Sequence, residues 1–210
     1  FALVEAGDLD GALVLYGRIR DEFPESRFVP DAHMAFAEAA FGGSYDYQSA
    51  LRDYEKVLTF PSSGLYDLAL FKSAWCLWKL GRTDEAATRF RRVLDLGDDR
   101  SKLTAEQRRR LEELQTEALD YLIQVFTEDE RNTAADVFGF LEGIGGEKYA
   151  YRVLSRLSET YVGQARYDRA VQAYRLLLEM DPASPEAPTY QREIAACYAG
   201  LEDDPNTVKA

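Results

Sequence analysis

The chain has 210 residues, of which 46% are hydrophobic and 30% are charged, a composition ordinary for a protein that buries an extended core. Its formal net charge of -12 disfavours binding to nucleic-acid phosphates and insertion into anionic membranes. No run of residues approaches the roughly 18 apolar positions that a membrane-spanning helix requires.

A small residue followed four positions later by an aromatic one recurs along the chain. In chain order the pairs are Ala12 with Tyr16, Ala50 with Tyr54, Ala86 with Phe90, Ala134 with Phe138, and Ala170 with Tyr174. Successive alanines lie 36 to 48 residues apart. A spacing of four places both residues of a pair on one face of a helix, where the alanine allows close approach and the aromatic ring fills the space beyond it.

A second helical pattern precedes these pairs, so the repeating unit is a helical hairpin. The upstream helices are clearest over residues 34–41, 70–77 and 154–161. Glycines at positions 7 and 81 fit the turns between paired helices, and Pro24, Pro61 and Pro182 fit the ends of the second helices. A single hairpin cannot cover its own apolar face, whereas stacked hairpins can.

The last clear copy resembles the tetratricopeptide repeat. The resemblance rests on the spacing of Leu154, Leu157, Ser158, Tyr161, Ala170, Tyr174 and Pro182, and it extends over nearly the whole chain. It implies an all-α fold, a right-handed α-α superhelix of four full helix hairpins with a partial repeat at each end. The expected single domain, 1–210, divides into a partial repeat 1–28, repeats 29–63, 64–97, 98–147 and 148–184, and a terminal half-repeat 185–210.

A narrower resemblance concerns cellular context. The stretches ALFKSAWCLWKLGRTDEA and YDRAVQAYRLLLEMDPASPEAP are similar to tetratricopeptide-repeat proteins of the proteobacterial cell envelope, such as outer-membrane assembly lipoproteins and gliding-motility proteins. This similarity favours a soluble protein of the periplasm or cell envelope over a cytoplasmic one. The first repeat begins in mid-helix with the apolar residues Phe1, Leu3 and Val4, and we expect the native protein to extend further towards its N-terminus.

The fourth repeat is expected to be irregular. It carries extra residues over Asp98–Glu113, and a capping box from Thr104 to Gln107 predicts a long helix that runs to about Phe126. The glycines after residue 142 predict a helix stop. Two interpretations stay open for Arg108, Arg109 and Arg110: a solvated helix extension with Arg–Glu pairs, or a docking patch for an acidic partner.

The first helices of such repeats line the concave face of the superhelix in the family, and that implies a binding groove. The corresponding groove residues are Phe71, Trp75, Trp78, Lys79, Leu119, Ile123 and Phe126. A wall of small residues is expected on one side at Ala35, Ala39 and Gly42, and a polar wall on the other at Arg152, Ser155, Glu159 and Val162. The alternative is that both tryptophans pack against neighbouring helices, since tryptophan is highly buried on average.

No residue pattern points to catalysis or to a metal. His33 is the only histidine, and Cys76 and Cys197 are far apart and explained by packing between helices. We therefore expect no enzyme activity, no cofactor and no metal site. The favoured function is a protein–protein interaction scaffold that binds a peptide or helix, and the partner's identity stays open. The alternatives are a self-assembly module, in which incomplete terminal repeats form a homo-oligomer, and a regulatory or substrate-binding domain of an enzyme.

Overall fold

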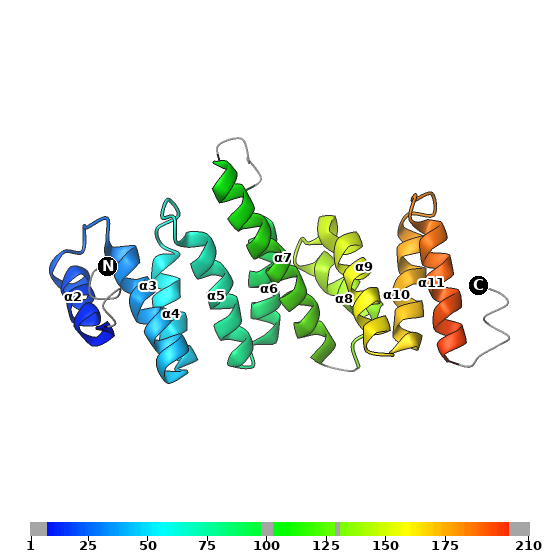
Figure 1. Cartoon of the computed structure of the whole chain (residues 1–210), viewed down its shortest axis with the longest axis horizontal. Helices are drawn as coiled ribbons and strands as arrows, with labels where there is room; N and C mark the ends of the chain where they lie inside the picture. Colours follow the sequence, from blue (N-terminus) through cyan, green and yellow to red (C-terminus); the bar gives the residue numbers. More distant parts are fainter. Residues whose placement is uncertain (1–7, 98–102, 129–130, 202–210) are drawn as a thin grey trace. The chain divides into compact units, whose positions relative to one another are not determined.

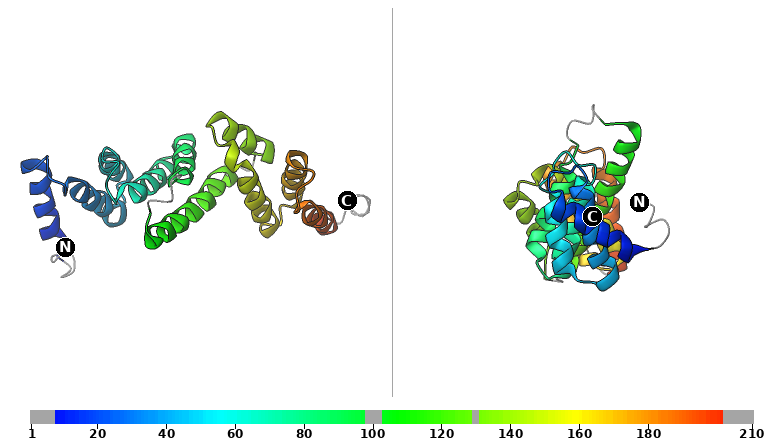
Figure 2. Two further views of the ribbon diagram at one scale, coloured as in Figure 1. Left: turned by 90° about the horizontal axis from the view of Figure 1, so that it is seen from above. Right: turned by 90° about the vertical axis from the view of Figure 1, so that its left-hand side faces the viewer.

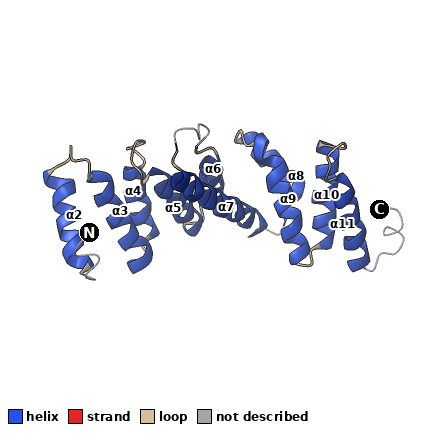
Figure 3. Cartoon of the chain, turned by 45° about the horizontal axis from the view of Figure 1, so that its top comes forward, coloured by secondary structure: helices blue, strands red, loops and turns tan. Residues whose placement is uncertain are grey.

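The computed structural model describes residues 8–97, 103–128 and 131–201, and every regular element in these ranges is a helix (Figure 3). The prediction of an all-α fold built from helical hairpins is therefore confirmed. The helices are α2 (Leu9–Glu22), α3 (Val29–Glu38), α4 (Tyr47–Val57), α5 (Tyr66–Lys79), α6 (Thr83–Leu94), α7 (Ala105–Glu128), α8 (Ala134–Gly143), α9 (Glu147–Gly163), α10 (Tyr167–Met180) and α11 (Ala187–Gly200). A π-helical segment, η1 (Ala39–Ser44), directly continues α3.

The chain forms two compact units, and the division between them falls within the sequence of α7. Unit 1 ends at Leu122 and unit 2 begins at Ile123. Within unit 1 the helices from α2 to α6 pack in chain order, each against the next, and within unit 2 the same holds from α8 to α11 (Figure 1). The view from above in Figure 2 shows α3 to α6 following one another in unit 1. Neighbours in sequence are therefore neighbours in space, as expected for repeats that bury their apolar faces by stacking.

The alanines of the repeated pairs lie in the core of their units. Ala50, Ala86 and Ala170 have no exposed surface, and Ala12 and Ala134 have almost none. The aromatic partners Tyr54, Phe90 and Tyr174 are also buried, whereas Tyr16 and Phe138 are only half-buried. The first difference arises because Tyr16 borders a surface hollow. In α8 the ring that packs on α7 is that of Phe140, 5.0 Å from the ring of Phe126.

The predicted turn and stop residues within the described ranges lie where helices end, and Gly7 lies outside those ranges. Helices α2, α4 and α10 end at Glu22, Val57 and Met180, each two to four residues before a proline. Gly81 has a φ of 73° between α5 and α6, a left-handed conformation that glycine adopts without steric cost. The equivalent turn between α9 and α10 has Ala165 at φ 57°, so a side chain is held there in a region that favours glycine.

Helix α7 begins as the sequence predicts. The backbone amide of Gln107 donates to Thr104 Oγ1 over 3.2 Å, and the amide of Thr104 donates to Gln107 Oε1 over 2.9 Å. Further along, the buried Gln115 donates through Nε2 to the carbonyl oxygens of Val93, Leu94 and Leu96, at 2.9 to 3.3 Å. Val93 and Leu94 are the last residues of α6 and Leu96 lies in the turn after it, where helix carbonyls lack their usual i+4 amide partners, so these bonds join α7 to the end of α6.

Candidate protein-binding site

An aromatic cluster on α5 occupies the predicted groove positions of unit 1. Phe71, Trp75 and Trp78 follow one another at intervals of four and three residues, which places them along one face of the helix. The ring centroids of the two tryptophans are 5.4 Å apart, and the ring of Tyr121 on α7 lies 5.0 Å from Trp75 and 5.9 Å from Trp78. Trp75 meets both Trp78 and Tyr121 in the edge-to-face arrangement that aromatic pairs prefer.

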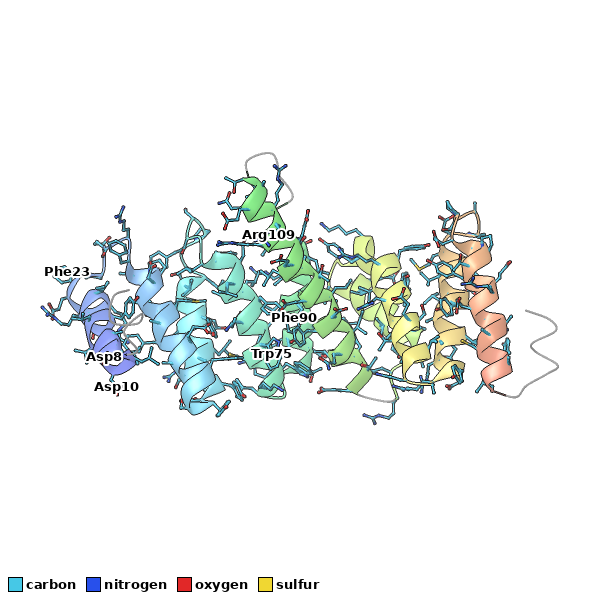
Figure 4. All side chains as sticks on the ribbon, viewed as in Figure 1. Asp8, Asp10, Phe23, Trp75, Phe90 and Arg109 are labelled. Carbon is cyan, nitrogen blue, oxygen red and sulfur yellow. The ribbon has the colours of Figure 1, made fainter. Side chains whose placement is uncertain are left out.

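Two further rings complete the cluster. Phe90 of α6 lies 5.8 Å from Phe71 and stacks on Tyr121 at 5.7 Å, and Figure 4 labels it beside Trp75. Phe41 of η1 approaches Trp75 from the other side at 6.1 Å. The cluster therefore comprises Phe41, Phe71, Trp75, Trp78, Phe90 and Tyr121, contributed by η1, α5, α6 and α7 in unit 1.

The cluster is buried at its base and open at the tryptophans. Phe90 is fully buried and Phe71 is 6% exposed, whereas Trp75 and Trp78 are only half-buried. Lys79 is exposed, and its Nζ lies 4.7 Å from the ring centroid of Trp75 and 4.9 Å from that of Trp78. The ammonium group is within range of favourable cation–π contacts with both indoles, so it borders the open side of the cluster.

The predicted groove residues on α7 are placed differently from those on α5. Leu119, Ile123 and Phe126 are all buried, and the last two belong to unit 2. The α7 residue that reaches the tryptophans is Tyr121, which sequence reasoning missed. It lies two positions from both Leu119 and Ile123. Side chains two residues apart on an α-helix point to nearly opposite sides. The signal that could have identified Tyr121 is an aromatic residue at a position outside the apolar repeat of the helix.

Unit 1 also contains a mainly apolar hollow of about 830 Å³ between α2, α3 and η1. The small residues predicted as a groove wall, Ala35, Ala39 and Gly42, line it together with Leu13 and Tyr16. The π-helical turn ends at Tyr45, which has a left-handed φ of 54°. Glycines without side chains at positions 42 and 43 suit this widened turn, and such segments are frequent at functional sites.

A second hollow, of about 500 Å³, lies between α9, α10 and α11 of unit 2. Three of the predicted polar-wall residues, Ser155, Glu159 and Val162, line it, and Arg152 is exposed elsewhere on α9. Three tyrosines and two further glutamates complete much of the wall. The two hollows therefore differ in balance: apolar side chains make up most of the first, which also borders Asp10, Asp31 and Glu38, whereas tyrosine rings and carboxylates make up most of the second.

The three arginines of α7 lie on exposed turns that project past the ends of α5 and α6 (Figure 1). Arg109 pairs with Glu113 over 3.4 Å, and Arg110 pairs with Glu106. Both are pairs four residues apart on one helix. This arrangement matches the interpretation of a solvated helix extension, and the docking patch that includes Arg108 stays a prediction.

The single histidine and the two cysteines have structural explanations. His33 Nδ1 lies 2.7 Å from Asp53 Oδ1 on α4. Cys76 and Cys197 are both free and buried, and burial raises the pKa of the Cys76 thiol to about 12. Within the described ranges no group of three or more His, Cys, Asp or Glu side chains could hold a metal ion. None of the described helices combines the length and apolar character needed to cross a membrane.

Comparisons with known proteins agree with a protein of stacked helical hairpins. Residues 68–96 and residues 151–184 each match a family model described as a tetratricopeptide repeat, and these segments coincide with the hairpins α5–α6 and α9–α10. The chain therefore contains tetratricopeptide repeats, with one recognised copy in each unit. Such repeats generally act as scaffolds for protein–protein interaction.

A solved structure, that of the MamA protein, is similar over 88% of this chain and 88% of its own, with 18% sequence identity and a TM-score of 0.42. No curated protein matches the sequence significantly. The assignment of tetratricopeptide repeats rests on the two matched segments and on the hairpins that they form.

Proposed function

We propose that this protein is a non-catalytic scaffold that binds a peptide or helix of a partner protein over the open side of the aromatic cluster. The observation that carries the proposal is the half-burial of both tryptophans of the chain on one helix face. Large rings held in place by neighbouring rings lose little side-chain entropy when a partner covers them. Tryptophan is also among the residues that contribute most to the affinity of protein interfaces.

Each predicted contact residue has a separate role in this proposal. Trp75 and Trp78 are the anchors, and Lys79 offers a charge at their edge to a partner carboxylate or carbonyl. Phe71 and Leu119 support the anchors from the buried side. Ile123 and Phe126 act within the core of unit 2. Arg108, Arg109 and Arg110 form a secondary patch for an acidic segment of the partner.

Burial of apolar surface sets the scale of the expected affinity. Covering about 300 Å² of apolar surface yields about 7 kcal/mol at 25 cal/mol per Å². Ordering the partner and losing its free motion offset part of this gain. The expected dissociation constant is therefore micromolar or higher, which suits a scaffold that binds its partner reversibly.

The test uses peptides selected from a random library displayed on phage with the whole chain as bait. Selected peptides are expected to lose at least about tenfold in affinity towards the Trp75→Ala/Trp78→Ala variant, because the anchors are removed. The matched control is Phe23→Ala/Phe28→Ala, which removes two exposed aromatic side chains of unit 1 outside the cluster. Equal loss in both variants, or no loss in the tryptophan variant, contradicts the proposal, and circular dichroism checks that helix content is retained.

A second candidate function is self-association through α2, in line with the predicted homo-oligomer. Leu9, Val14 and Leu15 on this helix are 60%, 65% and 49% exposed, and the unit 1 hollow borders the same helix. Several large exposed apolar side chains on one helix favour an interface between protein molecules. Sedimentation velocity on the chain and on Val14→Glu/Leu15→Glu is the test. A concentration-dependent dimer that the substitutions abolish supports this function, and a monomer at high concentration contradicts it.

Placement within a bacterial cell-envelope assembly remains a prediction from sequence resemblance. Localisation of the tagged protein in its native cell is the direct measurement.

A further inference from the structure

The hollow in unit 2 combines aromatic faces with carboxylates. Tyr151, Tyr174 and Tyr190 contribute the rings, and Glu159, Glu186 and Glu193 contribute the carboxylates. Helix α9 supplies Tyr151 and Glu159, α10 supplies Tyr174, and Tyr190 and Glu193 come from α11. The whole site therefore lies within one compact unit.

The three rings are held in place by one another. The centroids of Tyr174 and Tyr190 are 5.6 Å apart with the ring planes tilted by 30°, and Tyr151 lies 6.3 Å from Tyr190. The hydroxyl groups of Tyr151 and Tyr190 are hydrogen-bonded at 2.7 Å, and that of Tyr151 also bonds Ser184 Oγ at 3.1 Å. Burial and the bond from Tyr151 raise the pKa of Tyr190 to about 12. Tyr190 therefore keeps its proton at physiological pH, and the face of an aromatic ring is electron-rich.

The carboxylates surround these rings. Burial raises the pKa of Tyr174, and the charges of Glu193 and Glu159 raise it further, so both carboxylates act on the same ring. Their arginine partners lie towards solvent: Arg192, at 2.7 Å from Glu193, has a side chain 76% exposed, and Arg156, at 3.2 Å from Glu159, has one 50% exposed. Such exposed ion pairs contribute little to stability, so the glutamates can readily exchange these partners for another cation.

Glu186 makes no ion pair among the described residues, and none of the lining residues in the described ranges is basic. The hollow therefore has an excess of negative charge and one half-buried aromatic ring, Tyr151, beside two buried ones. An anion is repelled from it. A metal ion is also a poor occupant, because no trio of these side chains is arranged to hold one within the described residues.

We propose that the unit 2 hollow is a recognition site for a cationic side chain, and that the partner segment carries an arginine there. A guanidinium group is planar, stacks on aromatic rings and donates two parallel hydrogen bonds to a carboxylate. The half-buried ring of Tyr151 offers the stacking surface, backed by the buried rings of Tyr174 and Tyr190, and Glu186 and Glu193 offer the acceptors. The inference rests on the proposed function only in that a protein partner supplies the arginine.

The hollow is tested alone, without any partner. N-acetyl-arginine amide is titrated into the full chain, and binding is followed through backbone amide shifts in two-dimensional NMR spectra. The neutral isostere N-acetyl-citrulline amide is titrated in parallel. We expect saturable shifts at Ser155, Thr189 and Tyr190, with the arginine probe at least about fivefold tighter than the citrulline probe, as expected for a charge-assisted contact. Equal affinity of the two probes, or arginine shifts spread over the acidic surface, overturns the proposal.

Two variants separate the hollow from the general negative charge of the protein. Glu186→Gln/Glu193→Gln removes two charges from the lining, and we expect it to weaken the arginine probe about tenfold. Glu142→Gln/Glu179→Gln removes two exposed charges of unit 2 outside the lining and is expected to leave the affinity unchanged. Equal weakening by both pairs overturns the proposal.

The small-molecule titration also distinguishes this proposal from the proposed function. Failure of the arginine probe leaves peptide binding at the tryptophans intact, and loss of peptide binding in the tryptophan variant leaves the arginine titration unchanged.

Discussion

The two hairpins that match the repeat family share a framework and differ on their open faces. Counted from the left-handed residue of the turn, Gly81 in one and Ala165 in the other, the positions of Trp75 and Trp78 correspond to Glu159 and Val162. One hairpin therefore presents indole rings where the other presents a carboxylate and a valine.

The buried positions of the two hairpins agree closely. Ala86 and Ala170 have no exposed surface, and Leu70 and Leu154 one helix earlier are at most 1% exposed. Because small residues and leucines at these positions set the distance between paired helices, they are constrained by packing. Residues on the open face carry no such constraint. The buried framework of a hairpin therefore fixes where a residue on the open face lies. The side chains around that residue determine what the face binds.

The largest predicted effect separates the buried base of the aromatic cluster from its open side. Phe90→Ala is expected to lower the free energy of unfolding by about 3–5 kcal/mol, because it empties a fully buried site. Trp78→Ala removes a half-buried ring, and we expect a loss of about 1 kcal/mol. Urea denaturation of both variants measures the difference. A loss at Trp78 as large as that at Phe90 would make Trp78 a core residue and remove it from the binding face.

Substitutions in the turns at Gly81 and Ala165 are expected to have smaller effects on stability, of opposite sign in the two turns. Gly81→Ala is expected to destabilise the protein by about 1 kcal/mol, because alanine is strained at positive φ and nothing else lies near the added methyl group. Ala165→Gly is expected to stabilise it by about 0.5 kcal/mol, since relief of strain is partly offset by the entropy of glycine in the unfolded chain. Thermal unfolding of the two single variants and of the double variant tests this. Effects of the same sign would contradict it.

The sequence predicts the packing framework of the hairpins more fully than the contacts on their open face. Alanines, prolines and the Thr104–Gln107 capping box act through local geometry, so their positions could be inferred from spacing alone. Tyr121 and Phe41 reach Trp75 from other elements, and their contacts depend on how a 24-residue helix and a π-helical turn are rotated. The hydrogen bonds from Gln115 to the end of α6 likewise join residues about 20 positions apart, which no local pattern reports.

The smallest predicted effect concerns the exposed start of α7. Arg108→Gln/Arg109→Gln/Arg110→Gln is expected to shift Tm by less than about 2 °C, because exposed ion pairs on one helix contribute little. The same variant sharpens the role of the patch, since peptides with acidic residues should bind it more weakly if the arginines contact the partner. Unchanged affinity for acidic peptides would leave these residues as a solvated helix extension.

The most direct test of the central claim is the fluorescence of Trp75 and Trp78, the two tryptophans in the chain. Emission and acrylamide quenching are measured for the free chain and for its complex with a selected peptide that lacks tryptophan. The account predicts that quenching falls and emission shifts to shorter wavelength in the complex, because the peptide excludes water from the two indoles. A saturated complex whose tryptophans are quenched as strongly as those of the free chain would contradict it.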